Sequence, residues 1–329
     1  MNFFARGAFA ALLTVSTPAL ADTLKISTYL PPNHALNQEL EEWGKELSEK
    51  SGGELTVQIY PAGQLGPVNR QYDMVRDGVA DVSVVLHSAT PGRFPLTELA
   101  GLPLSYPSGG ETSEVTSRRL TELADTYLKD EHRGTKILWM AITPPLKFHF
   151  TKVDPTSLAA FKGLRIRYAG KVFQDIIEKL GASPIPVSPG ETGDALSKGI
   201  IDAATFPFEA TQSFGLAPAL KYSMSNGIAS ATFAVVMNQQ RFDALSPKLQ
   251  KLIVDTTGPD RAAHFGHSWD EHEAAGQKYL ESNGVKIVAL PEAEASKMKD
   301  LMKPLINDAI SAVAAKGKPA QAFYDAYVK

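Results

Sequence analysis

The 329-residue sequence predicts an α/β fold of two lobes, in which each lobe is a mixed sheet flanked by helices and one long helix spans both lobes. Three observations predict this fold class. Strand-like and helix-like segments alternate over residues 24–86, and the same alternation starts again over residues 163–206. A third region, residues 247–282, stays helical for longer than most helices of globular proteins.

The first lobe opens with a β-α-β-α-β pattern, which is typical of parallel strands joined by helices. Its first helical pattern repeats leucines and a tryptophan on one face and ends at a Ser-Gly-Gly sequence. The expected strands span residues 24–29, 55–60, 80–86 and 136–141, and the expected helices span residues 34–51, 68–78 and 113–129.

The second lobe repeats this pattern without repeating the sequence. The expected strands span residues 163–168, 183–187 and 203–206, and the expected helices span residues 172–180 and 191–198. Residues 229–237 are hydrophobic without polar alternation, which predicts a buried strand that crosses between the lobes.

The long helical region can be one helix, kinked near Pro259 or Gly266, that packs along both lobes. Two further helices are expected over residues 293–315 and 320–327. We divide the chain into a signal peptide, residues 1–21; a first lobe, residues 22–145 plus about 231–270; and a second lobe, residues 146–230 plus about 271–329.

The N-terminus has the pattern of a secretory signal peptide. One positive charge in residues 1–6 precedes a short apolar run, and Ala19-Leu20-Ala21 then forms an A-x-A cleavage site. The run of about 10 apolar residues is too short to span a bilayer. We therefore expect cleavage after Ala21 and export of the mature chain to a bacterial periplasm.

Composition and motifs exclude several classes of function. The sequence has no cysteine, which excludes disulfides, thiolate nucleophiles and cysteine-ligated metal clusters. With 33 basic and 36 acidic residues, the chain offers no broad basic surface for nucleic acid. It also lacks the nucleophile-elbow and phosphate-loop motifs, so we predict that it is not an enzyme and uses no cofactor.

Three histidines are the best metal-binding candidates in the sequence. His264, His267 and His272 fall within one helical segment, but without the H-E-x-x-H spacing of a zinc site. We interpret them as solvated side chains and predict no metal site.

Four motifs occur in order behind the signal peptide. They are YPAGQLG after the second strand, VRDGVAD before the third, FKGLRIR at the start of the second lobe, and LGASP followed by ALSKGIIDA. This ordered set resembles the periplasmic solute-binding subunits of tripartite ATP-independent periplasmic (TRAP) transporters, the DctP-like family. The resemblance covers essentially the whole mature chain and implies the two-lobe periplasmic binding protein fold.

Arg165 and Arg167 are the first candidate ligand-binding residues. They alternate with apolar residues, so both lie on one strand face. On the residues alone, two solvated or structurally paired arginines explain this pattern as well as ligand binding does. The planar guanidinium matches two carboxylate oxygens and keeps its charge. The resemblance implies that Arg167 binds a ligand carboxylate and that Arg165 is structural.

Two further positions depart from the family pattern. The resemblance implies a second arginine about twenty positions before Arg167, where this sequence has Lys147; a lysine reinforces the positive field without a fork, and a surface lysine is the alternative. Phe206 replaces an asparagine that the family commonly has before a proline. The ring removes a hydrogen-bond partner and adds an apolar wall, unless it only fills the core.

The other candidates come from the ends of strands, where ligands of open α/β sheets bind. The loop from Tyr29 to His34 and the loop after the third strand are expected to face the cleft. The candidates in these loops are His87 and Ser88 as hydrogen-bonding groups and Arg93 as an extra positive charge, and the candidates for an aromatic wall are Tyr29, Trp139 and Phe233.

These inferences predict a monomeric binding protein that closes on an organic acid anion, with hinges near residues 144–152 and 229–237. The favoured ligand is a monocarboxylate with an apolar or aromatic group, such as a 2-hydroxy- or 2-keto-acid, and a C4-dicarboxylate is the second choice. The resemblance implies delivery to two integral membrane subunits driven by an ion gradient. A secreted enzyme and a sensory binding protein remain as alternatives.

Overall fold

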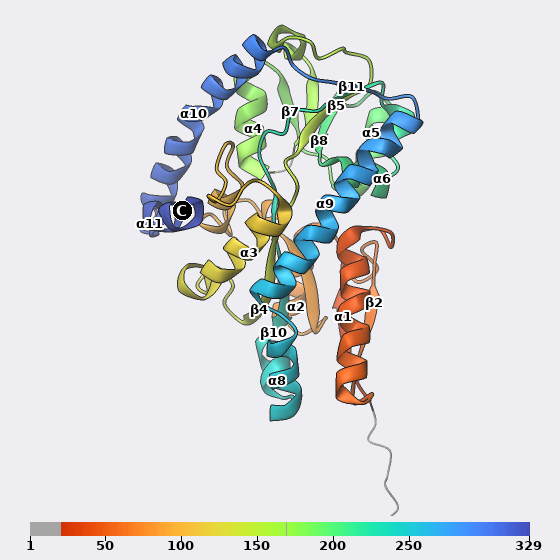
Figure 1. Ribbon diagram of the computed structural model, residues 1–329, viewed down its shortest axis with the longest axis vertical. Coiled ribbons are helices and arrows are strands. Elements are labelled where there is room, and N and C mark those ends of the chain that lie inside the picture. The colour runs from red at the N-terminus through yellow and green to blue at the C-terminus, as the bar shows by residue number, and fades with distance from the viewer. Residues whose placement is uncertain (1–20, 169) are drawn as a thin grey trace, which may run out of the picture.

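The computed structural model describes residues 21–168 and 170–329, so the predicted signal peptide, apart from Ala21, lies outside the described residues. The described chain forms two lobes, each built on one mixed sheet with helices packed against it (Figure 1). In this view the first lobe fills the lower half and the second lobe the upper half. The predicted fold class is confirmed.

The first sheet consists, in this order, of β2 (Leu55–Tyr60), β1 (Asp22–Ser27), β3 (Val82–Leu86), β10 (Thr232–Asn238) and β4 (Thr135–Ile142). β1 is parallel to β2 and β3, whereas β10 runs antiparallel between β3 and β4. Every residue of β3 and β10 is buried, as expected for central strands covered on both faces. The predicted buried crossing strand is therefore β10.

The helices of the first lobe are α1 (Ala35–Ser51), α2 (Gln71–Arg76), α3 (Ser113–Leu123), α7 (Gln239–Asp243) and α8 (Pro247–Asp255). His34 caps α1, because its Nδ1 accepts a hydrogen bond from the backbone N–H of Leu36 at 3.1 Å. α1 is capped at its C-terminus by Gly52, whose φ of 68° is the left-handed conformation that glycine adopts without strain.

The second sheet consists, in this order, of β11 (Lys286–Val288), β9 (Tyr222–Met224), β5 (Lys147–Phe150), β8 (Ala203–Phe206), β6 (Arg165–Arg167) and β7 (Ser183–Ile185). Its helices include α4 (Gly170–Lys179), α5 (Thr192–Ser197) and α6 (Phe208–Ser213). β6 is parallel to β7 and β8, and β5 is antiparallel to β8 and β9. The carboxyl ends of β6 and β8 therefore lie side by side and carry Arg167 and Phe206.

The chain crosses between the sheets from β4 to β5 and returns from β9 to β10. The two crossings are hydrogen-bonded to each other: the N–H of Thr143 donates to the carbonyl of Ala231 at 3.0 Å, and the N–H of Leu146 donates to that of Ala229 at 2.8 Å. The predicted hinge segments overlap these two crossings.

The predicted long helix is two helices. α8 ends at Asp255, and α9 (Pro259–Ser282) begins after Gly258, whose φ is 87°. The break therefore falls at the predicted Pro259, whereas Gly266 lies inside a continuous helix instead of at a kink. Proline suits the first turn of α9 because the N–H that it lacks would have no helical partner there.

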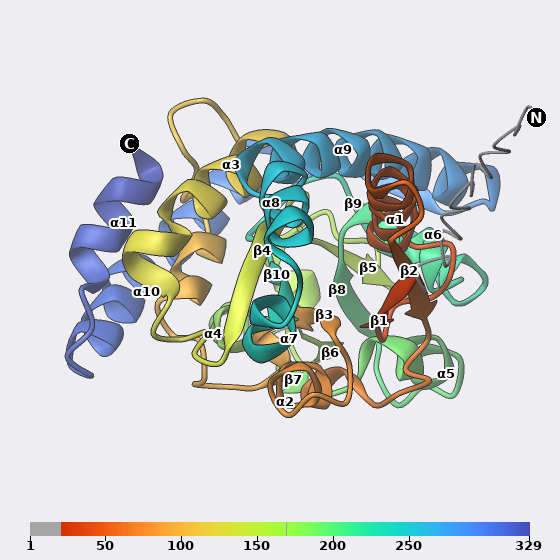
Figure 2. The same ribbon diagram turned by 90° about the horizontal axis from the view of Figure 1, so that it is seen from below.

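α9 lies along both lobes, and Figure 2 shows it crossing one side of the molecule. A Cβ atom on Gly266 would lie 2.4 Å from the carbonyl oxygen of Ser113 in α3, and one on Gly276 would lie 2.4 Å from that of Phe208 in α6. The two glycines thus allow α9 to approach the backbone of each lobe closely.

The C-terminal helices return to the first lobe. α10 (Glu292–Ala314) descends from the second lobe to α11 (Ala320–Val328) in Figure 1. Phe323 and Tyr327 of α11 are fully buried in the apolar cluster that contains Tyr72 and Leu120. The division that assigned residues 271–329 to the second lobe is therefore wrong for α11. Among the described residues, no helix is long and apolar enough to span a bilayer.

Candidate ligand-binding site

A cavity of about 40 Å³ lies between the two lobes, beside the crossings. Its walls are mostly apolar, and the aromatic side chains among them are Tyr29, Phe206, Phe214, Phe233 and Trp269. Several of its residues follow the carboxyl ends of strands, which is where ligands of α/β sheets bind.

Arg167 is the cationic side chain of this cavity, and it is 3% exposed. Its Nε donates to the carbonyl of Val187 at 3.2 Å and its Nη1 to that of Thr205 at 2.8 Å. No carboxylate of the described residues lies within ion-pair distance of its guanidinium. Burial lowers the pKa of Arg167 to about 10, against a smaller opposing effect of Tyr29, so the guanidinium stays charged at neutral pH.

Tyr29 follows β1 and lines the same cavity as Arg167. Burial raises the pKa of Tyr29, so the phenol stays protonated and able to donate a hydrogen bond. Within residues 21–168 and 170–329 the hydroxyl has no hydrogen-bond partner. Arg167 and Tyr29 therefore offer unused donors in the same cavity.

Glu209 of α6 joins the two lobes next to the cavity. Its Oε2 lies 3.4 Å from His34 Nε2 and accepts a hydrogen bond from Trp269 Nε1 at 3.3 Å. Burial lowers the pKa of His34, and the Glu209 carboxylate only partly opposes this effect. His34 belongs to the loop predicted to face the cleft, and it lines the cavity.

Phe206 is 5% exposed, and its ring centroid lies 4.1 Å from the guanidinium carbon of Arg167 and 5.7 Å from the Phe214 ring. Phe233 also lines the cavity, with its ring 5.6 Å from that of Trp269. The structure thus brings together four of the predicted residues, namely Tyr29, Arg167, Phe206 and Phe233.

Lys147 lies on β5 outside the cavity lining. Its ammonium group forms an ion pair with Glu273 of α9 and lies 4.6 Å from the ring of Phe208. The other carboxylate oxygen of Glu273 accepts a hydrogen bond from the backbone N–H of Glu209 at 2.9 Å. Lys147 is thus neutralised by a structural partner, and the site lacks the second charge predicted there.

His87 and Trp139 are also buried away from the cavity. His87 Nδ1 lies 3.0 Å from Thr232 Oγ1, and its Nε2 lies 3.1 Å from Nε2 of His132. Trp139 packs its ring 5.7 Å from that of Trp43 in the core of the first lobe.

Ser88 and Arg93 lie on the first lobe outside the cavity. Ser88 contacts Gly170 at the start of α4, where a Cβ atom would lie 2.6 Å from that of Ser88. Arg93 pairs with Asp73 at 2.8 Å and lies 4.4 Å above the ring of Tyr72. Its charge is therefore satisfied by a neighbouring helix.

The sequence analysis missed several residues that line the cavity, among them a threonine and two aromatic residues. Thr143 lies at the first crossing, Phe214 directly after α6 and Trp269 on α9. The hydrophobic face of α9 was visible in the sequence, but the part of it that meets the cavity depends on how both lobes pack.

The three histidines of α9 face different partners. His264 contacts Glu39 at 3.2 Å, His267 contacts Glu114 at 3.1 Å, and His272 Nε2 lies 3.0 Å from Gln38 Oε1. In the described part of the chain, one group, Glu39 with Glu42 and His264, has a metal-like spacing. Arg261 already pairs with Glu39 at 2.8 Å, which accounts for the buried carboxylate without a metal.

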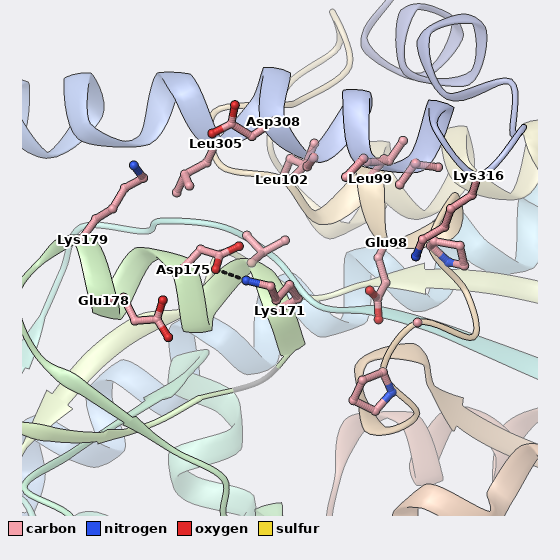
Figure 3. Close-up of a pocket in the computed structure, with 17 residues that line it drawn as sticks. Glu98, Leu99, Leu102, Lys171, Asp175, Glu178, Lys179, Leu305, Asp308 and Lys316 are labelled. Atoms are coloured by element: carbon pink, nitrogen blue, oxygen red, sulfur yellow. Dashed lines mark hydrogen bonds and ion pairs between the residues drawn. The ribbon is translucent and has the colours of Figure 1, made fainter.

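A wider groove of about 920 Å³ runs between α4, α10 and residues 91–102 (Figure 3). Its lysines, Lys171, Lys179 and Lys316, are exposed, and Lys171 pairs with Asp175. Charges of both signs on an exposed rim give the groove no preference for an anion, so the smaller cavity at Arg167 is the better candidate.

Comparisons with known proteins show the family to which this chain belongs. The profile of the family described as "DctP: Bacterial extracellular solute-binding protein, family 7" matches residues 26–312. A TRAP solute-binding protein from a marine metagenome, specific for aromatic acids and solved with metahydroxyphenylacetate, is 29% identical, with a TM-score of 0.88 over 93% of this chain and 96% of that one.

Two further solved structures are similar. A TRAP solute-binding protein from Rhodoferax ferrireducens, solved with copurified benzoate, is 28% identical and has a TM-score of 0.88 over 93% of this chain and 96% of its own. One from Bordetella bronchiseptica, solved with (R)- and (S)-mandelate, is 32% identical and has a TM-score of 0.85 over 93% and 97%. The predicted resemblance is confirmed: this chain belongs to the DctP family of bacterial extracellular solute-binding proteins, the solute-binding proteins of TRAP transporters.

Proposed function

We propose that this protein captures an organic monocarboxylate with an aromatic or branched apolar group, such as a 2-hydroxy- or 2-keto-acid, and delivers it to the membrane subunits of a TRAP transporter. The observation that carries the proposal is the buried Arg167, which has no carboxylate partner among the described residues. A buried charge without a counter-ion costs several kcal/mol. A ligand carboxylate offsets this cost.

The hydrogen-bonding groups match a carboxylate. A guanidinium has five N–H groups, and backbone carbonyls occupy two of those of Arg167. The remaining N–H groups and the Tyr29 hydroxyl are donors for both oxygens of one carboxylate.

Charge balance favours one carboxylate over two. Lys147 is neutralised by Glu273, and burial lowers the pKa of His34, which favours its neutral form. A second ligand carboxylate would therefore be buried without a cation, which is costly. This is the reason to prefer a monocarboxylate to a C4-dicarboxylate.

The walls of the cavity favour an apolar group on the ligand. Phe206, Phe214 and Phe233 present ring surface, and such rings stabilise an aromatic or branched group by burial and by ring-to-ring contact. The aromatic acids bound by the similar proteins support the same ligand class.

Capture would proceed by closure of the lobes. Groups of both lobes surround the cavity, so a ligand enters when the lobes move apart at the two crossings. The contact between Glu209 and His34 then forms on closure. It excludes water from the ion pair between Arg167 and the ligand carboxylate. The protein would act as a periplasmic monomer and catalyse no reaction.

Titration calorimetry of residues 22–329 with benzoate, mandelate, 3-hydroxybenzoate and succinate tests the proposal. At least one aromatic acid should bind, and succinate should bind more weakly. Arg167→Ala should weaken binding by about 30-fold or more, because a buried charge pair is worth about 2–5 kcal/mol. Arg165→Ala is the matched control: Arg165 lies on the same strand, is exposed and pairs with Asp202 at 2.8 Å.

Unchanged affinity in Arg167→Ala would remove Arg167 from its assigned role. Absence of binding by every acid in the panel would overturn the proposed ligand class. Tighter binding of succinate than of the aromatic acids would favour a dicarboxylate.

A further inference from the structure

Thr143 links the ligand cavity to the two crossings between the lobes. It follows β4 on the first crossing, and Ala231 precedes β10 on the second. The N–H of Thr143 donates to the Ala231 carbonyl at 3.0 Å, and the N–H of Ala231 donates to Thr143 Oγ1 at 2.9 Å. Both residues line the cavity, so one side chain touches the hinge and the ligand space together.

The hydroxyl hydrogen of Thr143 is unused. A threonine hydroxyl has one hydrogen to donate and two lone pairs to accept. Thr143 Oγ1 accepts from Ala231, but within residues 21–168 and 170–329 its hydrogen has no acceptor. Other buried threonines differ: Thr121 donates to the carbonyl of Ser117 at 2.8 Å and Thr211 to that of Phe208 at 2.7 Å.

The surroundings of Thr143 make this donor selective. Thr143 is 4% exposed, and the neighbouring cavity wall includes the apolar side chains of Leu86, Leu146 and Phe233. A buried donor without an acceptor costs about 1–3 kcal/mol, so a ligand that supplies an acceptor gains most of that amount.

We propose that Thr143 selects ligands that carry an oxygen in addition to their carboxylate, as a hydroxyl or oxo group that accepts its hydrogen bond. This inference rests on the proposed function, in which Arg167 and Tyr29 bind the carboxylate. Arg167 belongs to the sheet of the second lobe and Thr143 to the chain leaving the sheet of the first lobe. The two contacts therefore address different parts of one ligand.

The contact also couples ligand chemistry to the hinge. The oxygen that donates its hydrogen to the ligand accepts the Ala231 N–H, and hydrogen bonds in such a chain strengthen one another. A ligand oxygen thus strengthens the bond that holds the two crossings together.

Two matched ligand pairs test the proposal: phenylacetate with mandelate, and benzoate with 3-hydroxybenzoate. Wild type should bind the oxygenated member of at least one pair about tenfold more tightly, the effect of one buried hydrogen bond. Thr143→Val, which keeps the shape and removes the hydroxyl, should abolish this ratio, and Thr143→Ser should retain it. Thermal melting of each variant checks that it folds.

The ratio of the two affinities within a ligand pair distinguishes failure of the proposed function from failure of the role of Thr143. If wild type binds neither member of either pair, the proposed function fails and this inference falls with it. If wild type binds the acids without preference for the oxygenated member, only the role of Thr143 is overturned. The same holds if Thr143→Val leaves the ratio unchanged, for example by weakening both members equally. Should Thr143→Val not fold, Thr143→Cys supplies a weaker donor, and an unchanged ratio in that variant also contradicts the proposal.

Discussion

The cavity at Arg167 and the polar clusters buried beside the sheets satisfy their hydrogen bonds in opposite ways. Lys147 is neutralised by Glu273, and the ring nitrogens of His149 contact the carbonyl of Phe206 at 2.9 Å and the hydroxyl of Ser223 at 2.7 Å. Arg167 is equally buried but has carbonyl partners and no counter-ion in the described part of the chain. Burial alone therefore does not identify a charged side chain that binds a ligand. The distinguishing feature is the lack of a counter-ion among the described residues.

The largest expected effect is a loss of free energy of unfolding at acid pH, caused by three buried histidines, His87, His132 and His149. Burial lowers the pKa of His132 and of His149 to about 4 and holds that of His87 well below its usual value. Their stabilisation is complete above the unfolded pKa of about 6.5 and is lost as the pH falls through the folded values, at about 1.4 kcal/mol per pH unit for each histidine.

Chemical denaturation at pH 7.5, 6 and 5 measures this loss. The free energy of unfolding should fall by several kcal/mol between pH 6.5 and 5. Ligand affinity should change little over the same range, because Arg167 stays charged with its pKa of about 10. A free energy of unfolding that does not change with pH would contradict this prediction, because it would mean that these histidines become protonated in the folded protein without a loss of stability.

A pair of methionine variants compares the two buried cations directly. Lys147→Met leaves the carboxylate of Glu273 without its cation and should lower the free energy of unfolding by about 3 kcal/mol. Arg167→Met removes an unpaired charge along with two hydrogen bonds to carbonyls, so ligand-free stability should change by less than about 1 kcal/mol.

Urea denaturation of the ligand-free proteins distinguishes these cases. The double variant Lys147→Met/Glu273→Leu should recover most of the lost stability, because no charge is left buried. Equal losses in the two single variants would mean that Arg167 is as structural as Lys147.

The smallest effect concerns the wall of the cavity. Phe206→Asn should weaken binding of an aromatic acid by about tenfold more than binding of a small polar acid, because the ring surface is replaced by an amide. Phe206→Leu is the control, since it keeps an apolar wall. Calorimetric titration of both variants reads out this selectivity, and equal losses for both acids would make Phe206 a core residue only.

Much of the fold could be predicted because the α/β pattern is local. α1, β2 and β8 lie where hydrophobic periodicity and turn residues place them. β5, β9 and β11 were not predicted, because strands of three or four residues are too short to give a clear periodic signal, and even the alternation of polar and apolar residues in β5 covers only two periods.

Site residues could be predicted from the sequence where their position depends only on lying at the end of one strand. Arg167 and Phe206 lie at the ends of adjacent strands, and both line the cavity. Lys147 lies outside it because its partner Glu273 is 126 residues away in sequence, and Thr143 was missed because its role depends on Ala231 on the other crossing. Contacts between distant segments of the chain are not visible in local patterns.

The packing of α11 also constrains how the first lobe is assembled. The lobe begins at β1, yet the fully buried rings of Phe323 and Tyr327 come from α11, which lies far from β1 in the sequence. A chain made from its N-terminus therefore cannot complete this core before α11 has been synthesised. Any core that the first lobe forms before that point lacks the rings of Phe323 and Tyr327.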